Sequence, residues 1–218
     1  MIKISILCSD PTHPVNNYIY AWKKENQNNF QIDVFRKKNE LKSGNILFLI
    51  SCSEVITTSE KTKFEHTLVL HASDLPFGRG WSPHIWQILE GKTEITLTLL
   101  EAHDKVDRGA IWKKIKLKIP KSALWNEINQ IIFTAEIKLI NFAIENYKTI
   151  MPTSQKKVLE EFYYPKRNPK DSEVNPSLSL ESQFNILRVS DPFRYPAFFY
   201  LHDKKYKIIL EQINDDCD

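Results

Sequence analysis

The sequence predicts an open, Rossmann-like α/β fold, in which a mostly parallel sheet carries helices on both faces. Short apolar runs alternate with stretches of helical character in the first half of the chain. Residues 45–50 (NILFLI) are apolar throughout, which is typical of a strand buried on both faces of a parallel sheet. A short β appendage is expected at the C-terminal end.

The expected strands are apolar or rich in β-branched residues and are bounded by polar segments. They cover residues 3–8, 30–35, 45–50, 67–70, 94–100 and 111–119. A helical stretch around residues 18–24 separates the first two strands. A long amphipathic helix is expected over residues 122–148, because apolar side chains recur there at helical spacing. These side chains are Leu124, Ile128, Ile131, Ala135, Leu139 and Phe142.

The composition of the chain changes after residue 150. Residues 151–178 hold several prolines and long polar stretches, which is typical of a linker or an irregular arm. The expected division is a catalytic domain over residues 1–150, the arm over 151–180 and a small β extension over 181–218. In the extension, strands are expected at residues 183–189, 197–201 and 206–210, with a turn at 191–196.

Charge and cysteine content narrow the function classes. The chain of 218 residues has 30 basic and 27 acidic side chains without a basic block, so no nucleic-acid partner is expected. Its three cysteines lack CxxC spacing, which argues against a disulfide framework and against structural zinc. No secretory leader and no membrane-spanning run is visible, so a cytoplasmic location without a membrane partner is expected. Neither GxGxxG nor a Walker loop is present.

Residues 71–109 concentrate the features expected of a functional site. They hold four of the chain's five glycines and three of its six histidines. His71 directly follows an apolar strand, and open α/β sheets bind ligands beyond the carboxyl ends of their strands. Ser82 and Pro83 are expected to begin a helix, with the serine capping its free amides, and Gly91 is expected to end it.

The motifs of this stretch resemble those of the formyltransferases that use 10-formyltetrahydrofolate. The matching residues are His71 after a strand, Ser73, Leu75 and Pro76 in an S-x-L-P pattern, Arg79-Gly80, Pro83, Gly91 and Val106-Asp107-Arg108-Gly109. The resemblance covers roughly residues 45 to 210. The short tail is similar to that of enzymes that formylate an amine of a nucleotide-linked deoxysugar. Residues 71–92 and the short chain most resemble the formyltransferases that act on a UDP-linked 4-amino sugar of the pseudaminic acid type.

The resemblance implies site residues and ligands. His71 is expected to be the catalytic acid or base, with Asp107 orienting it. The cofactor is expected to be 10-formyltetrahydrofolate, with no metal. The residues expected to hold the folate are Arg79, Gly80, Trp81, Glu101, Ala102, His103 and Asp104. Those expected to bind the nucleotide sugar are Ser73, Arg188, Asp191, Arg194, Tyr195 and Phe198.

Two of these assignments have structural alternatives. Trp81 would serve equally well as a hydrophobic core residue. The aromatic residues of the tail would serve as the packing side of a plain β hairpin. An apolar, aromatic tail is also compatible with a homodimer.

Val69 is the one departure from the family pattern. The family has an asparagine at this position, two residues before the histidine, which helps to hold the formyl oxygen. Loss of one such donor costs about 10²–10³ in rate. Ser51, Ser53, His71 itself or a backbone amide could replace it. A folate- or nucleotide-binding protein without catalysis therefore stays open as an alternative. A formyl-folate hydrolase and a tRNA formyltransferase are further alternatives within the fold, and the short tail and modest charge count against the tRNA enzyme.

Overall fold

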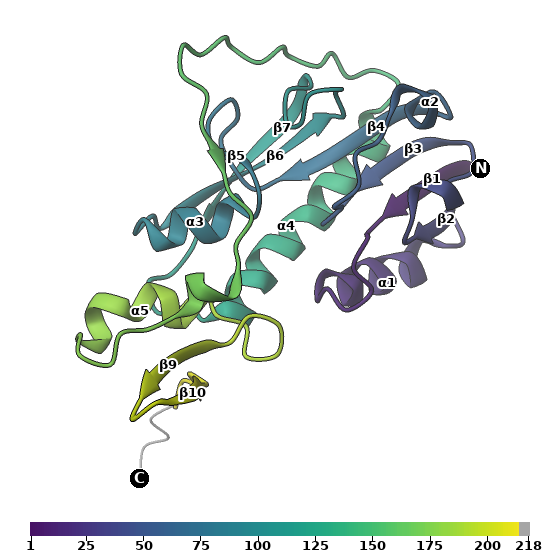
Figure 1. The fold of residues 1–218 in the computed structure, drawn as a ribbon. Coiled ribbons are helices and arrows are strands. Elements are labelled where there is room, and N and C mark those ends of the chain that lie inside the picture. Colours follow the sequence, from purple (N-terminus) through teal and green to yellow (C-terminus); the bar gives the residue numbers. More distant parts are fainter. Residues whose placement is uncertain (214–218) are drawn as a thin grey trace.

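A six-stranded sheet forms the centre of the computed structural model, which describes residues 1–213 (Figure 1). The strand order is β2-β1-β3-β4-β6-β7. Four strands are parallel to one another, and β6 and β7 run antiparallel to their neighbours. The predicted, mostly parallel α/β sheet is confirmed. The bounds are β1 (Ile2–Leu7), β2 (Phe30–Phe35), β3 (Gly44–Leu49), β4 (Phe64–His71), β6 (Glu94–Glu101) and β7 (Ile111–Lys118).

Helices cover the two faces of this sheet unequally. Both α1 (Val15–Asn26) and the long helix α4 (Trp125–Asn146) pack on one face, as Figure 1 shows. The opposite face is covered by the short helices η1 (Lys38–Glu40) and α2 (Thr58–Lys61) and by the loops beside them. The long amphipathic helix predicted from its apolar spacing is confirmed.

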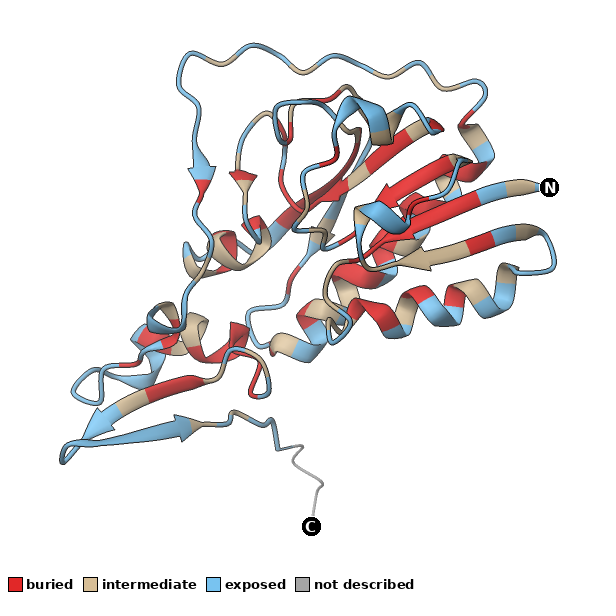
Figure 2. Cartoon of the chain, turned by 45° about the vertical axis from the view of Figure 1, so that its right-hand side comes forward, coloured by how far each residue is buried: buried red, intermediate tan, exposed pale blue. Residues whose placement is uncertain are grey.

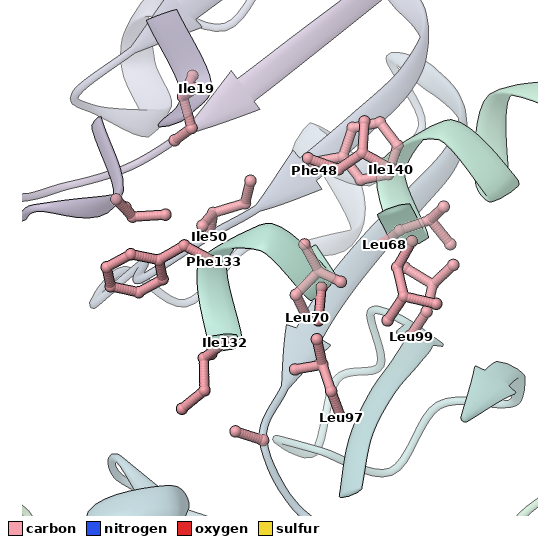
Figure 3. Close-up of a cluster of buried hydrophobic side chains, with 14 of the residues drawn as sticks. Ile19, Phe48, Ile50, Leu68, Leu70, Leu97, Leu99, Ile132, Phe133 and Ile140 are labelled. Atoms are coloured by element: carbon pink, nitrogen blue, oxygen red, sulfur yellow. The ribbon is translucent and has the colours of Figure 1, made fainter. Parts of the chain in front are cut away.

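The main core lies between α4 and the centre of the sheet. Leu68 and Leu70 of β4 lie beside Leu97 and Leu99 of β6 and opposite Ile132 of α4, and none of these side chains is more than 9% exposed (Figure 3). Full burial of a leucine or isoleucine side chain contributes about 1.5–3 kcal/mol. The central strands are accordingly buried along most of their length in Figure 2. This packing fixes the carboxyl end of β4 relative to α4.

Residues 183–189, predicted as a strand, are part of helix α5 (Leu180–Val189), so that prediction was wrong. The Ser179 hydroxyl accepts a hydrogen bond from the Ser182 amide at 3.2 Å and caps the helix. Gln183 and Leu187, four residues apart, are both buried on one side. The apolar side chains between residues 184 and 189 are compatible with a strand locally, but the cap and the i, i+4 spacing select a helix.

The predicted strand at residues 197–201 is confirmed as β9 (Ala197–Leu201). It pairs antiparallel with β10 (Lys204–Ile208), which begins two residues earlier than expected. The hairpin extends from the body of the protein and is largely exposed in Figure 2. The short C-terminal β appendage is therefore present.

The segment between α4 and α5 crosses the protein with little regular structure. Its ordered pieces are β8 (Tyr163–Tyr164) and the 3-10 helix η2 (Pro169–Ser172). β8 pairs in parallel with β5 (Arg79–Gly80), which brings the arm to the stretch around His71. The division of the chain at residues 150 and 180 stays a prediction.

Helix α3 (Pro83–Leu89) has the predicted proline at its first position and ends as expected at Gly91, whose φ is 86°. The predicted cap was wrong, since the side chain of Ser82 makes no capping hydrogen bond. Ser82 has φ 44°, a left-handed conformation that does not direct its hydroxyl to the helix amides. Within residues 1–213, no helix is long and apolar enough to cross a membrane.

Two glycines provide a matched test of this fold. A Cβ added at Gly109 would lie 1.7 Å from the Glu101 carbonyl oxygen, whereas one added at Gly91 meets nothing within 4 Å. We expect Gly109→Ala to destabilise the protein severely, by roughly 3 kcal/mol or more, because the backbone of β6 must move. Gly91→Ala should cost only about 1 kcal/mol, from the left-handed backbone. Urea unfolding of both variants checks this, and equal losses would contradict it.

Candidate active site

A cavity of about 600 Å³ opens at the carboxyl ends of β1, β3 and β4. Ser9, Ser51 and His71, which lie at or directly after the ends of these strands, all line it. Open α/β sheets bind ligands at this edge, and the volume is in the range of small-molecule sites. The position predicted for the site from the strand preceding His71 is therefore a real cavity.

His71 and Asp107 lie together at this edge, and both side chains are less than 10% exposed. His71 Nδ1 is 3.5 Å from Asp107 Oδ1, and His71 Nε2 is 3.0 Å from the Gly78 carbonyl oxygen. Because a carbonyl oxygen only accepts hydrogen bonds, Nε2 carries the proton in that contact. Nδ1 then gains a proton only when the ring becomes positively charged, and Asp107 faces it there.

Asp107 is fixed from two directions. Its Oδ2 accepts a hydrogen bond from the Gly80 amide at 2.9 Å, and its backbone is left-handed with φ 58°. Aspartate and asparagine tolerate this conformation better than most residues. The Gln155 side chain also donates to the carbonyl oxygens of Asp107 and Gly109, at 2.8 and 2.9 Å. The irregular arm thus contributes directly to holding the site.

Arg79 holds the same loop and does not line the cavity. Its Nε donates to the Asp107 carbonyl oxygen at 3.3 Å and its Nη2 to Gln155 Oε1 at 2.9 Å. Only 3% of the residue is exposed. Arg79 was predicted to lie at the entrance of a folate site. In the structure these contacts hold its guanidinium inward, away from the cavity.

The other residues predicted to hold folate divide into two groups. Gly80, Trp81, Glu101, Ala102 and His103 line the cavity. Trp81 is 43% exposed, which removes the alternative that it is a core residue. Asp104 does not line the cavity, because its carboxylate is drawn outward to Lys61 Nζ, 2.6 Å away.

Of the residues predicted to bind the nucleotide sugar, some line the cavity and others do not. Asp191, Arg194 and Tyr195 line the cavity, and Arg194 is paired with Asp10. Arg188 does not, because its Nη1 donates to the carbonyl oxygens of Pro120 and Ala123.

Phe198 and Ser73 also lie away from the cavity wall. Phe198 is buried, with Lys205 Nζ 3.7 Å from its ring centroid. Ser73 is 1% exposed, and its backbone oxygen accepts from the Thr98 hydroxyl at 2.7 Å.

The residues that line the cavity belong to the core clusters on the two faces of the sheet, and the two sets differ in character. One part, the Val69 compartment, lies on the η1 and α2 side and is mainly apolar. The other, the Glu136 compartment, lies on the α4 side and contains buried polar groups. The Val69 compartment is lined by Leu49, Cys52, Ile56, Val69 and Ala102, and the Glu136 compartment by His13, His84, Ile132, Phe133 and Glu136.

The three ionisable groups of the Glu136 compartment were missed from the sequence. Burial lowers the pKa of His84 to about 3 and, with a smaller contribution from Arg194, lowers the pKa of His13 to about 4. Burial raises the pKa of Glu136 to about 8. All three side chains are therefore uncharged at neutral pH.

A sequence signal for Glu136 was available. Ile128, Ile132, Glu136 and Ile140 follow one another at i, i+4 spacing, and all four are buried. A carboxylate in the apolar stripe of an amphipathic helix is unusual enough to mark a site. Ser51, suggested as a replacement for the asparagine missing at Val69, lines the cavity with its hydroxyl 3.2 Å from His13 Nε2. Ser53 lines it too.

Metal ligands do not gather in this structure. Among the described residues 1–213, no group of three or more histidine, cysteine, aspartate or glutamate side chains is placed to hold a metal ion.

Comparison by sequence finds formyltransferases, while no family model matches the chain. The chain is 28% identical over 152 residues to the bifunctional polymyxin resistance protein ArnA of Wigglesworthia glossinidia brevipalpis, covering 66% of this chain and 22% of that protein. It is 25% identical over 203 residues to a methionyl-tRNA formyltransferase of Buchnera aphidicola, covering 88% of this chain and 60% of that enzyme. The chain thus spans less than two thirds of the length of either relative.

Solved structures have the same fold at lower identity. A methionyl-tRNA formyltransferase from Clostridium thermocellum has a TM-score of 0.79 at 22% identity, covering 100% of this chain and 96% of that one. HypX from Aquifex aeolicus, in complex with tetrahydrofolic acid, has a TM-score of 0.79 at 19% identity, covering 96% and 37%. A sugar N-formyltransferase from Shewanella has 0.71 at 15%, covering 98% and 100%. The chain therefore has the formyltransferase fold, and its sequence is similar to those of formyltransferases.

Proposed function

We propose that this protein transfers a formyl group from 10-formyltetrahydrofolate to the amine of a nucleotide-linked amino sugar. The observation that carries the proposal is the buried His71–Asp107 pair at the carboxyl end of β4, where it faces a cavity with two compartments. A transferase needs room for a donor and an acceptor on either side of its reacting groups. The two compartments meet that need.

The Val69 compartment suits the folate. It offers apolar walls from Val69 and Ala102, the backbone of the segment after β6, and the exposed ring of Trp81 at its entrance. A flat heteroaromatic ring with polar edges is held well by such a combination of apolar walls and backbone groups. Bound there, the folate would supply a formyl group activated for transfer to an amine. The HypX structure with tetrahydrofolic acid, which has the same fold, supports a folate as the donor.

His71 and Asp107 provide the proton chemistry. An amine that attacks the formyl carbon must lose a proton as its new C–N bond forms. His71 can accept that proton at Nδ1, since its Nε2 proton is engaged with the Gly78 carbonyl oxygen. The protonated ring can then return the proton to N10 of the folate as the formyl C–N10 bond breaks, which releases tetrahydrofolate and regenerates neutral His71. The carboxylate of Asp107, 3.5 Å away, stabilises the resulting positive ring. The Gly80 amide keeps the carboxylate in place while this happens.

The acceptor is assigned to the Glu136 compartment and the residues beside it. Asp191 and Arg194 line the cavity close to His13, together with Tyr195 and with Arg167 from the arm. Lys166 of the arm lies over the Trp81 ring, with its Nζ 5.1 Å from the ring centroid. Arginine and lysine side chains suit a pyrophosphate, and tyrosine can stack on a base. The Shewanella sugar N-formyltransferase, which has the same fold, supports a sugar acceptor.

Methionyl-tRNA is the second candidate acceptor. The Buchnera and Clostridium enzymes, both named methionyl-tRNA formyltransferases, support it. Against it stands the small net charge of +3, because tRNA binding usually draws on a concentrated basic surface.

A turnover assay decides between the acceptors. Purified protein is mixed with 10-formyltetrahydrofolate and a panel of UDP- and dTDP-linked amino sugars, with methionyl-tRNA as a parallel sample, and released tetrahydrofolate is followed by absorbance. We expect turnover with one nucleotide sugar and loss of about 10²–10⁴ in kcat in His71→Asn, because the proton acceptor is gone. Folate binding without turnover would indicate a binding protein, and formate release without an acceptor would indicate a hydrolase.

Asp107 allows a separate test with a built-in structural control. Asp107→Asn keeps a side-chain oxygen for the Gly80 amide and tolerates the left-handed backbone, but loses the negative charge beside His71. We expect a fall of about 10²–10⁴ in kcat with a loss of stability below about 1 kcal/mol. Asp107→Ala should lower both, because it also loses the hydrogen bond. An Asp107→Asn enzyme with wild-type kcat would refute the role of the charge.

A further inference from the structure

Glu136 is a buried carboxyl group without a protein partner. It lies in the buried stripe of α4 and is 8% exposed. Its Oε2 is fully buried and makes no hydrogen bond with any described residue. The residue nevertheless lines the cavity, beside Ile132 and Phe133. Buried polar groups are nearly always paired. Because the two oxygens of a carboxyl group exchange places by rotation about the Cγ–Cδ bond, a ligand in the cavity can supply the partner that this group lacks.

His84 of helix α3 repeats this pattern in the lining of the same cavity. Its Nδ1 is also buried without a hydrogen-bond partner among the described residues, and the residue lines the same cavity. A buried lone pair without a donor costs less than a buried N–H without an acceptor, so the proton is expected on Nε2. The ring then presents one neutral donor and one neutral acceptor.

The compartment is polar but carries little charge at neutral pH. The pKa of Glu136 is raised to about 8 by burial, which leaves its carboxyl group protonated and able to donate a hydrogen bond. Nearby histidines are held neutral in the same way, as described above for His84 and His13. Such a set offers no strong partner to a phosphate or an ammonium group. It would also leave its polar atoms unpaired against a thioether chain such as that of methionine.

We propose that the Glu136 compartment binds the uncharged, hydroxyl- or amide-bearing ring of the acceptor, and that Glu136 donates a hydrogen bond to one of its oxygens. This inference rests on the proposed formyl transfer and deepens it, because it gives a physical reason for a sugar ring in place of a methionyl side chain. The charged ends of the acceptor are left to the arginine and lysine side chains at the rim.

Three variants of α4 test the inference with the nucleotide sugar that the wild-type enzyme turns over. Glu136→Leu removes both polar atoms at nearly constant volume, Glu136→Gln keeps a neutral N–H donor, and Glu145→Leu changes an exposed glutamate of the same helix. We expect Glu136→Leu to raise KM for the sugar about 10- to 100-fold, with KM for the folate unchanged. Glu136→Gln should recover KM to within about threefold of wild type, and Glu145→Leu should behave as wild type.

The pH dependence of KM provides a readout that a structural role would not move. Ionisation of Glu136 near pH 8 would replace its donor by a negative charge, so wild-type KM for the sugar should rise above pH 8, whereas KM of Glu136→Gln should stay flat. Burial is the cause of its pKa shift, and no neighbouring charge contributes. The ionisable groups on the surrounding elements are Asp10, His13, His84, Arg167, Arg188, Asp191 and Arg194.

Distinct outcomes separate this inference from the proposed function. Wild-type turnover with unchanged KM in Glu136→Leu would overturn the inference alone. Equal impairment of Glu136→Gln and Glu136→Leu would overturn the donor role, since a negative charge would then be required. Formylation of methionyl-tRNA that Glu136→Leu leaves intact or improves would overturn the sugar-ring assignment. No turnover of any amino sugar by the wild-type enzyme would reject the proposed function itself. Thermal unfolding of each variant verifies that it is folded.

Discussion

The hydrogen bond from the Gly80 amide to the Asp107 carboxylate is the contact on which the site depends. It joins the loop after β6 to β5, and β5 is itself paired with β8 of the arm. A Cβ at Gly80 would lie 2.3 Å from the Tyr164 carbonyl oxygen, so this approach of two backbones requires glycine. Three segments far apart in the sequence are thereby held at one point, and His71 receives its partner from that point.

Features of the fold and the site could be predicted from the sequence where they depend on neighbouring residues, but not where they depend on contacts between distant segments. The strands, α4 and the position of His71 followed from periodicity and from the strand before the histidine, because both are properties of neighbouring residues. The strand predicted at 183–189 was wrong because its apolar residues fit either a strand or a helix, and the Ser179 cap that favours the helix lies outside that range. Arg188 was misjudged for a different reason: its partners, Pro120 and Ala123, are more than sixty residues away in the chain.

Val69 and Glu136 are two residues of the candidate site whose roles could not be predicted from local sequence signals. Val69 was recognised as a departure from the family motif, but only the structure relates it to an apolar compartment on one face of the sheet. The sequence shows Glu136 at i, i+4 spacing within the apolar stripe of a helix. Periodicity alone, however, predicts that every residue of this stripe packs in the core. A buried ionisable side chain can be recognised as a binding group when it lines a cavity. A cavity forms only in the assembled fold, so the sequence alone does not reveal it.

The polar groups of the Glu136 compartment also carry a cost in stability. The pKa of Glu136 is raised from an ordinary 4.5 to about 8, so the folded state binds its proton more tightly, and the free energy of unfolding decreases as pH rises between those values. His13 and His84 act in the opposite direction, because their lowered pKa values reduce stability as pH falls below about 6.5. Apolar residues at all three positions would remove both losses. A fold that keeps three such groups around one cavity, two of them with atoms unpaired among the described residues, forgoes stability at a place where a ligand can complete the hydrogen bonds.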